Sequence, residues 1–117
     1  MKTFRILIIE DEPLVAADLE SIIIEIVPAI VMVEASVEAA RKMLHEALDF
    51  AFLDVNVTDG KTFEIAHVLE HKHVPFVFVS ASPQEQLPPA LRTAPFLPKP
   101  FYPAEIERAL QAIVDET

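Results

Sequence analysis

Five short apolar runs alternate along the chain with longer stretches of helical periodicity, and this alternation constrains the fold more than any other feature of the sequence. Most of the runs are continuously apolar, as is typical of strands that are covered on both faces. Strands that alternate with helices favour right-handed crossovers and a parallel sheet. The expected strands are Arg5–Ile9, Ile30–Val33, Phe50–Leu53, Phe76–Val79 and Phe96–Leu97.

The stretches between the runs predict four helices with recognisable ends. Ser36 is the expected N-cap of the second helix, Pro28 follows the first, and Pro103 precedes the last. The expected helices are Pro13–Ile26, Val37–Ala47, Thr62–Glu70 and Ala104–Val114. The first should bury a broad apolar stripe, interrupted by Asp18, that consists of Leu14, Val15, Ala17, Ile22, Ile23 and Ile26.

The segment Ser80–Pro100 departs from this pattern because it is rich in proline. Eight of the ten prolines fall in residues 75–103, and Pro88–Pro89 stands where a further helix would be expected. Proline removes a backbone donor, and its ring clashes with the preceding helical turn. We therefore expect a further helix here, the fourth along the chain and before Ala104–Val114, that is short or irregular and lies within Gln84–Thr93.

Size and charge narrow the class of protein. The 117 residues predict a single domain, 1–117, with no output domain. Cysteine is absent, and the sole glycine, Gly60, excludes glycine-rich phosphate loops. The net charge of −10 without a basic run argues against nucleic acid or an anionic membrane as a partner. No apolar run is long enough for a signal peptide or a membrane span, so we expect a cytoplasmic protein.

Polar side chains follow the expected strands at the points where they end. In open α/β sheets, ligands bind at the carboxyl ends of the strands, so these side chains should meet at one edge. Glu10, Asp11 and Glu12 follow the first strand, Asp54 and Asn56 the third, Ser80 the fourth and Lys99 the fifth.

This set has a definite chemistry. Carboxylates held close together repel one another unless a cation compensates them, and Mg²⁺ prefers oxygen ligands such as these. With Mg²⁺ in place, Asp54 is a nucleophile that can form an aspartyl phosphate. Ser80 and Lys99 can then bind and neutralise the phosphoryl oxygens.

The segments RILIIEDE, FLDVN, FVSAS and LPKPF stand in this order at these strand ends. With them the chain resembles the receiver domain of bacterial two-component response regulators over essentially its full length. The resemblance implies a doubly wound, five-stranded parallel sheet of flavodoxin-like order 2-1-3-4-5 with helices on both faces.

The resemblance also implies roles for individual residues. Asp54 would be the phosphoacceptor, Ser80 and Lys99 would form the phosphoryl pocket, and Phe96 would be the switch aromatic. Phosphorylation would pull Ser80 toward Asp54 and let Phe96 move inward. Magnesium would be held by Asp11, Asp54, the backbone carbonyl of Asn56 and, through a water, Glu10. The Lys99–Pro100 peptide would be cis.

The implied partners are a sensor histidine kinase or phosphotransfer protein, and a downstream protein target or a second copy of the chain. Self-phosphotransfer and autodephosphorylation would be the only catalysis, so we do not expect an enzyme. The sequence departs from the family pattern where Glu10 replaces the commoner aspartate and where Asp59–Gly60 follows Asp54 early.

Three other functions stay open. The first is a Mg²⁺-dependent aspartyl-phosphate phosphatase, although such enzymes carry an acidic residue where this chain has Asn56. The second is a flavin-binding carrier of the same topology, whose phosphate the acidic residues after the first strand would repel. The third is an interaction module that works without phosphorylation.

Overall fold

The computed structural model describes residues 2–115, and five parallel strands form its central sheet in the order β2-β1-β3-β6-β7. β1 lies between β2 and β3, and β6 connects β3 to the edge strand β7. This confirms the predicted doubly wound order. The strands are β1 (Phe4–Ile9), β2 (Ala29–Glu34), β3 (Phe50–Leu53), β6 (Phe76–Ser80) and β7 (Phe96–Pro98).

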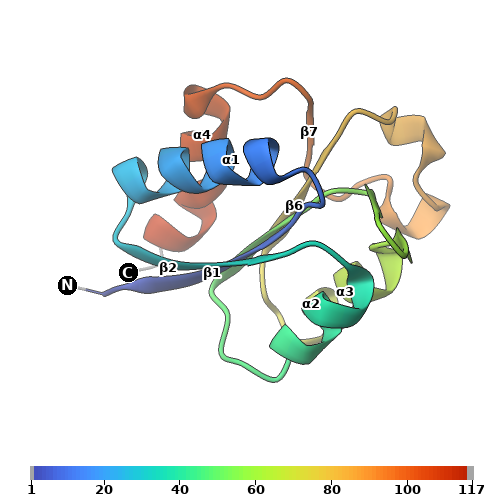
Figure 1. The fold of residues 1–117 in the computed structure, drawn as a ribbon, viewed down its shortest axis with the longest axis horizontal. Coiled ribbons are helices and arrows are strands. Elements are labelled where there is room, and N and C mark those ends of the chain that lie inside the picture. The colour runs from blue at the N-terminus through green and yellow to red at the C-terminus, as the bar shows by residue number, and fades with distance from the viewer. Residues whose placement is uncertain (1, 116–117) are drawn as a thin grey trace.

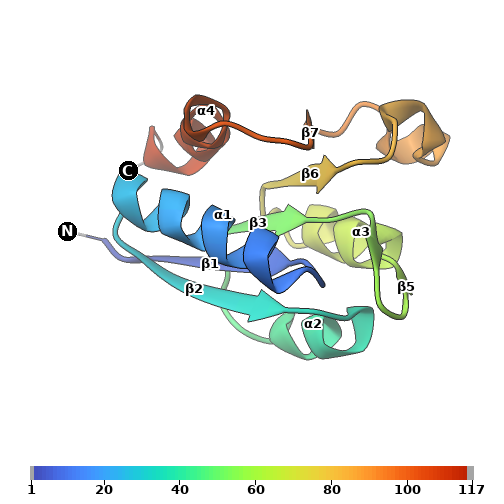
Figure 2. The same cartoon turned by 45° about the horizontal axis from the view of Figure 1, so that its top comes forward.

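Two helices cover each face of this sheet (Figure 1; Figure 2). Helices α1 (Pro13–Ile26) and α4 (Pro103–Val114) lie on one face, and α2 (Val37–Met43) and α3 (Phe63–His71) lie on the other. The layers follow from the alternation of side chains along each strand. Ile6 and Ile8 of β1 pack into the core beneath α1 and α4, whereas Leu7 and Ile9 pack into the core beneath α2 and α3.

Two sequence predictions about the helices are wrong in detail. Helix α2 ends at Met43 rather than at Ala47, because the backbone turns more tightly there and Lys72 donates a hydrogen bond to the Leu44 carbonyl. On α1, Leu14 is 86% exposed and Ala17 is exposed as well. The side chains that α1 buries are Ala16, Leu19 and Ile23, because the stripe was too broad for its whole width to face the sheet.

The proline-rich segment after β6 confirms its prediction. Two 3-10 turns, Gln84–Gln86 and Pro89–Leu91, replace a regular helix. The segment is anchored by Leu87 and Leu91, which are 1% and 0% exposed and belong to the core beneath α2 and α3. In Figure 1 this segment, drawn in tan and orange, projects away from the sheet beyond the end of β6.

One element was not predicted. The chain between β3 and α3 forms a small antiparallel hairpin of β4 (Asn56–Val57) and β5 (Gly60–Lys61). Gly60, the sole glycine, has a φ of 140°, which residues with a side chain rarely adopt. No helix between residues 2 and 115 has the length and apolar character needed to cross a membrane.

Candidate functional site

Asp54 is positioned by the backbone ladder that joins the central strands. Its N–H donates to the Ile9 carbonyl at 2.9 Å, so the β1–β3 pairing continues one residue beyond β3. In the same way, the Glu10 N–H donates to the Glu34 carbonyl at 3.0 Å, and the Lys99 N–H donates to the Ser80 carbonyl at 3.0 Å. The main chain at each of these positions is thereby held to the neighbouring strand. The positions of Glu10, Asp54 and Lys99 are therefore set by the sheet rather than by flexible loops.

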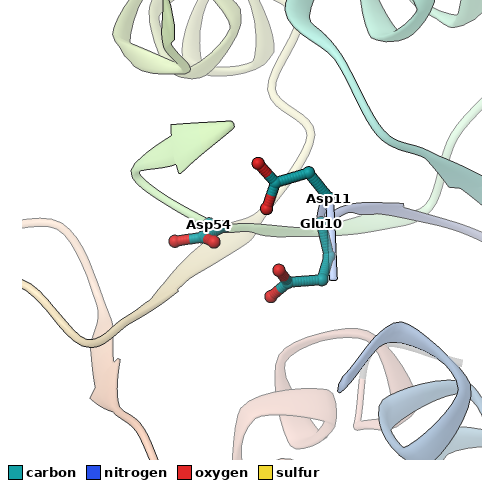
Figure 3. A group of neighbouring side chains, drawn as sticks. All are labelled: Glu10, Asp11 and Asp54. Carbon is teal, nitrogen blue, oxygen red and sulfur yellow. The ribbon is translucent and has the colours of Figure 1, made fainter. Parts of the chain in front are cut away.

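The carboxylates of Glu10, Asp11 and Asp54 form one cluster, in which one oxygen from each lies within 4.8 Å of the others. Figure 3 shows the side chains of Glu10 and Asp11 leaving the end of β1 and flanking the carboxylate of Asp54. Glu10 and Asp54 are buried, and Asp11 is half-buried. Burial makes the mutual repulsion of these charges stronger than it would be in water.

The ammonium of Lys99 compensates part of this charge. Its Nζ lies 2.7 Å from Glu10 Oε1 and 3.3 Å from Asp54 Oδ2, and the exposed Glu12 approaches to 3.9 Å. Three carboxylates and one ammonium leave two negative charges uncompensated. A divalent cation would balance this set, and the all-oxygen donors suit Mg²⁺ or Ca²⁺ rather than a softer metal.

The protonation of the pair formed by Glu10 and Lys99 follows from its surroundings. Burial raises the pKa of the Glu10 carboxyl, and hydrogen bonds from Lys99 and from the Glu12 N–H lower it only in part. Burial alone would lower the pKa of Lys99, but the hydrogen bond to Glu10 and the charge of Asp54 outweigh it, and the pKa is raised. Lys99 is therefore a cation throughout the neutral range.

The other predicted residues lie on β4, β6 and β7. Ser80 ends β6, is 2% exposed and accepts a hydrogen bond from the Ser82 N–H at 3.1 Å. Asn56 is exposed, and its side chain donates to Ser82 Oγ at 3.2 Å and accepts from Lys61. Phe96 is half-buried beside the core beneath α2 and α3. The Lys99–Pro100 peptide is cis, as predicted.

Thr62 is a site residue that the sequence did not reveal. Its side chain is fully buried, and Oγ1 donates to the main-chain carbonyl of Asp54 at 2.6 Å. The Thr62 N–H also donates to the Val55 carbonyl at 3.1 Å. Threonine at the start of a helix is usually read as a cap, yet this hydroxyl makes no cap bond to α3. It closes the loop that carries Asn56 instead.

A groove of about 550 Å³ opens beside the cluster, between the start of α1 and the chain that follows β7. Lys99 lines it together with Leu14, Val15 and Phe101. The apolar side chain of Leu14, which was expected to face the core, is therefore exposed near the acidic cluster.

Comparisons with known proteins agree with this fold. No protein-family model matches the chain. The phyllosphere-induced regulator PhyR of Methylorubrum extorquens is 31% identical over 111 residues, which are 91% of this chain and 42% of PhyR. The solution structure of SdrG from Sphingomonas melonis is 30% identical with a TM-score of 0.81, covering 97% of this chain and 99% of SdrG. The HemR receiver domain of Leptospira biflexa is 28% identical with a TM-score of 0.77, covering 97% of this chain and 95% of that domain.

The last two likenesses extend over nearly the whole of both chains, and the sheet order is the one expected of the family. The chain belongs to the receiver-domain family of response regulators. It spans less than half the length of the curated relatives that it matches, 46% and 42%.

Proposed function

We propose that this receiver domain is a phosphorylation switch in which Asp54 accepts a phosphoryl group from a histidine kinase or phosphotransfer protein. One observation carries the proposal. The buried Asp54 carboxylate lies 3.3 Å from the Lys99 ammonium and beside the carboxylates of Glu10 and Asp11. Groups that could serve as a nucleophile, as a cation for the phosphoryl oxygens and as metal ligands thus lie together at the carboxyl ends of the strands.

The donor set fits Mg²⁺, which is small and uses only one or two carboxylates beside water and phosphate oxygens. Asp11, Asp54 and the backbone carbonyl of Asn56 would hold it directly, and Glu10 would act through a bound water. When bound, the ion would offset charge on the phosphoryl oxygens during transfer.

Four residues of the chain have separate roles in the proposed phosphoryl transfer and in the response to it. An Asp54 oxygen attacks phosphorus, and its new bond forms as the bond from phosphorus to the donor nitrogen breaks, with the electron pair leaving on the nitrogen. The Lys99 ammonium stabilises the charge on the phosphoryl oxygens. Ser80 Oγ already accepts the Ser82 N–H, so its O–H can donate to a phosphoryl oxygen. Movement of Ser80 toward that oxygen lets Phe96 turn inward, which carries the signal to the surface.

The partners act at two places. The phosphodonor protein docks on the groove between α1 and the chain after β7, because that groove presents Leu14 and ends at Lys99. A downstream protein, or a second copy of this chain, binds to α4 and β7, since the segment after β6 offers only two 3-10 turns and no regular helix. The domain works in the cytoplasm, binds neither nucleic acid nor membrane, and has no separate catalytic task.

Intact mass after incubation with a small-molecule phosphodonor and Mg²⁺ tests the proposal. The wild type should gain the mass of one phosphoryl group, and Asp54→Ala should gain none. Asp115→Ala, which removes an exposed carboxylate at the end of α4, is the matched control and should be modified like the wild type. Equal modification of Asp54→Ala would overturn the assignment.

The same preparation separates the alternatives. A wild type that is inert to the donor would indicate an interaction module that works without phosphorylation. Steady release of inorganic phosphate from a small phosphomonoester would indicate a phosphatase instead.

A further inference from the structure

The loop that carries Asn56 is closed by its own bonds. Asn56 pairs with Lys61 and Val57 pairs with Gly60 in the β4–β5 hairpin, and Thr62 ties the end of the loop to Asp54 and Val55. The Lys61 ammonium also donates to the side-chain oxygen of Asn56. An isolated two-stranded hairpin is only marginally stable in water, so a hairpin of two residue pairs needs support from the rest of the domain.

Asp59, at the tip of this hairpin, supplies part of that support, beside the buried Val57 and the hydrogen bond from Asn56 to Ser82. Its Oδ1 accepts the Val37 N–H at 2.6 Å, and its Oδ2 accepts the Glu38 N–H at 3.1 Å. Both donors lie in the first turn of α2, where backbone N–H groups have no partner within the helix. Hydrogen bonds of this kind to an ionised carboxylate are about twice as strong as neutral ones. The tip is therefore fixed to a helix that contributes no residue to the acidic cluster.

We propose that Asp59 is a positioning residue for the metal and phosphoryl site, acting through the hairpin on the main chain of Asn56. The inference rests on the proposed function, because the Asn56 carbonyl is there assigned as a metal ligand. With Asp59 in place, the tip of the hairpin is anchored to α2 and its base to β3, so Asn56 lies between two fixed points. Without Asp59, the strand that carries Asn56 can move away from Asp54.

A merely structural role as a cap of α2 is the competing explanation, and the chain offers a matched control for it. Ser36 caps the same helix by accepting the Ala39 N–H at 3.1 Å, and this bond does not involve the hairpin. Ser36→Ala and Asp59→Ala each remove side-chain caps from the first turn of α2. Only Asp59→Ala releases the hairpin.

The test is Mg²⁺ affinity, measured by calorimetry on the full chain of the wild type, Asp59→Ala, Asp59→Asn and Ser36→Ala. Removing a group that orients a metal ligand typically weakens metal affinity by about 10- to 100-fold, and we expect about tenfold for Asp59→Ala. Asp59→Asn keeps one accepting oxygen and should lose less. Ser36→Ala should bind Mg²⁺ like the wild type. Amide exchange at residues 55–61 should quicken in Asp59→Ala and stay unchanged in Ser36→Ala.

Unchanged affinity in Asp59→Ala, or an equal loss in Ser36→Ala, would overturn the inference and leave the proposed function standing. A wild type that binds Mg²⁺ but takes up no phosphoryl group would overturn the proposed function alone. A wild type that binds no Mg²⁺ would overturn both.

Discussion

Two segments leave the end of the sheet that carries the acidic cluster, and they are held in different ways. The loop after β3 buries Val55 and Val57, and polar bonds fix it as well, from Thr62 to the Asp54 carbonyl and from two backbone N–H groups to Asp59. The segment after β6 is fixed mainly by burial, since Leu87 and Leu91 are almost inaccessible to solvent. Directional bonds fix the position of the backbone atoms that they join, whereas apolar contacts leave a segment more freedom to move. The two kinds of attachment should respond differently to substitution and to pH.

Leu91→Ala should have the largest effect on stability. Leu91 is fully buried in the core beneath α2 and α3, and shortening a buried leucine to alanine costs about 2–5 kcal/mol in the free energy of unfolding. Denaturation in urea measures the change. Leu14→Ala, at a site that is 86% exposed, is the control and should stay close to the wild type. A small loss in Leu91→Ala would show that the prolines, not the buried leucines, hold the segment.

Thr62→Val should lower the free energy of unfolding by less, and it tests the polar bonds that hold the loop after β3. The substitution keeps the shape and removes the hydroxyl that donates to the Asp54 carbonyl, and losing one partner of a buried hydrogen bond costs about 1–3 kcal/mol. The same urea titration measures it. Thr93→Val changes an exposed threonine and should be nearly neutral. If Thr62→Val lost more unfolding free energy than Leu91→Ala, the polar bonds rather than the buried leucines would be the stronger attachment.

The sequence predicted the strands and the positions of Asp54 and Lys99 because both depend on short-range patterns, whereas the order of the strands came from the family resemblance. Asp54 directly follows a fully buried strand, and Lys99 follows the brief run at Phe96, so the topology alone brings them to one edge. The backbone clash of Pro88 and Pro89 is also local, and the two 3-10 turns confirm its effect. The roles of these residues in phosphoryl transfer stay predictions.

What the sequence did not predict depends on encounters between distant parts of the chain. Asp59 bonds to the backbone of residues 21 and 22 positions away, and a backbone N–H leaves no mark in the sequence. Thr62 was assigned to a helix start, because nothing local shows that its hydroxyl turns back to Asp54. Helical periodicity likewise could not decide that Leu14 lies on the exposed side of the stripe of α1.

The smallest expected effect is a pH dependence of the unfolding free energy, which should come from the hydrogen bonds of Asp59 and not from the buried leucines. Hydrogen bonds from the Val37 and Glu38 N–H groups hold the pKa of the Asp59 carboxyl below its usual range. A carboxyl with a lowered pKa stabilises the fold fully above its unfolded pKa of about 3.9, and this contribution is lost as the pH falls through the folded value. Asn at position 59 cannot titrate. The difference in unfolding free energy between the wild type and Asp59→Asn should therefore be largest near neutral pH and shrink in acid below about pH 4.

Urea titrations of the wild type and Asp59→Asn across this range measure the difference. Leu91→Ala is the control from the other segment, and its difference from the wild type should not follow this titration, because the residue carries no ionisable group and is held by apolar contacts. An Asp59→Asn difference that stays constant through the acid range would mean that the charge of Asp59 does not hold the hairpin tip. In that case the loop after β3 would depend on burial, as the segment after β6 does. Val57, which is 8% exposed, would then anchor the hairpin as Leu91 anchors the segment after β6.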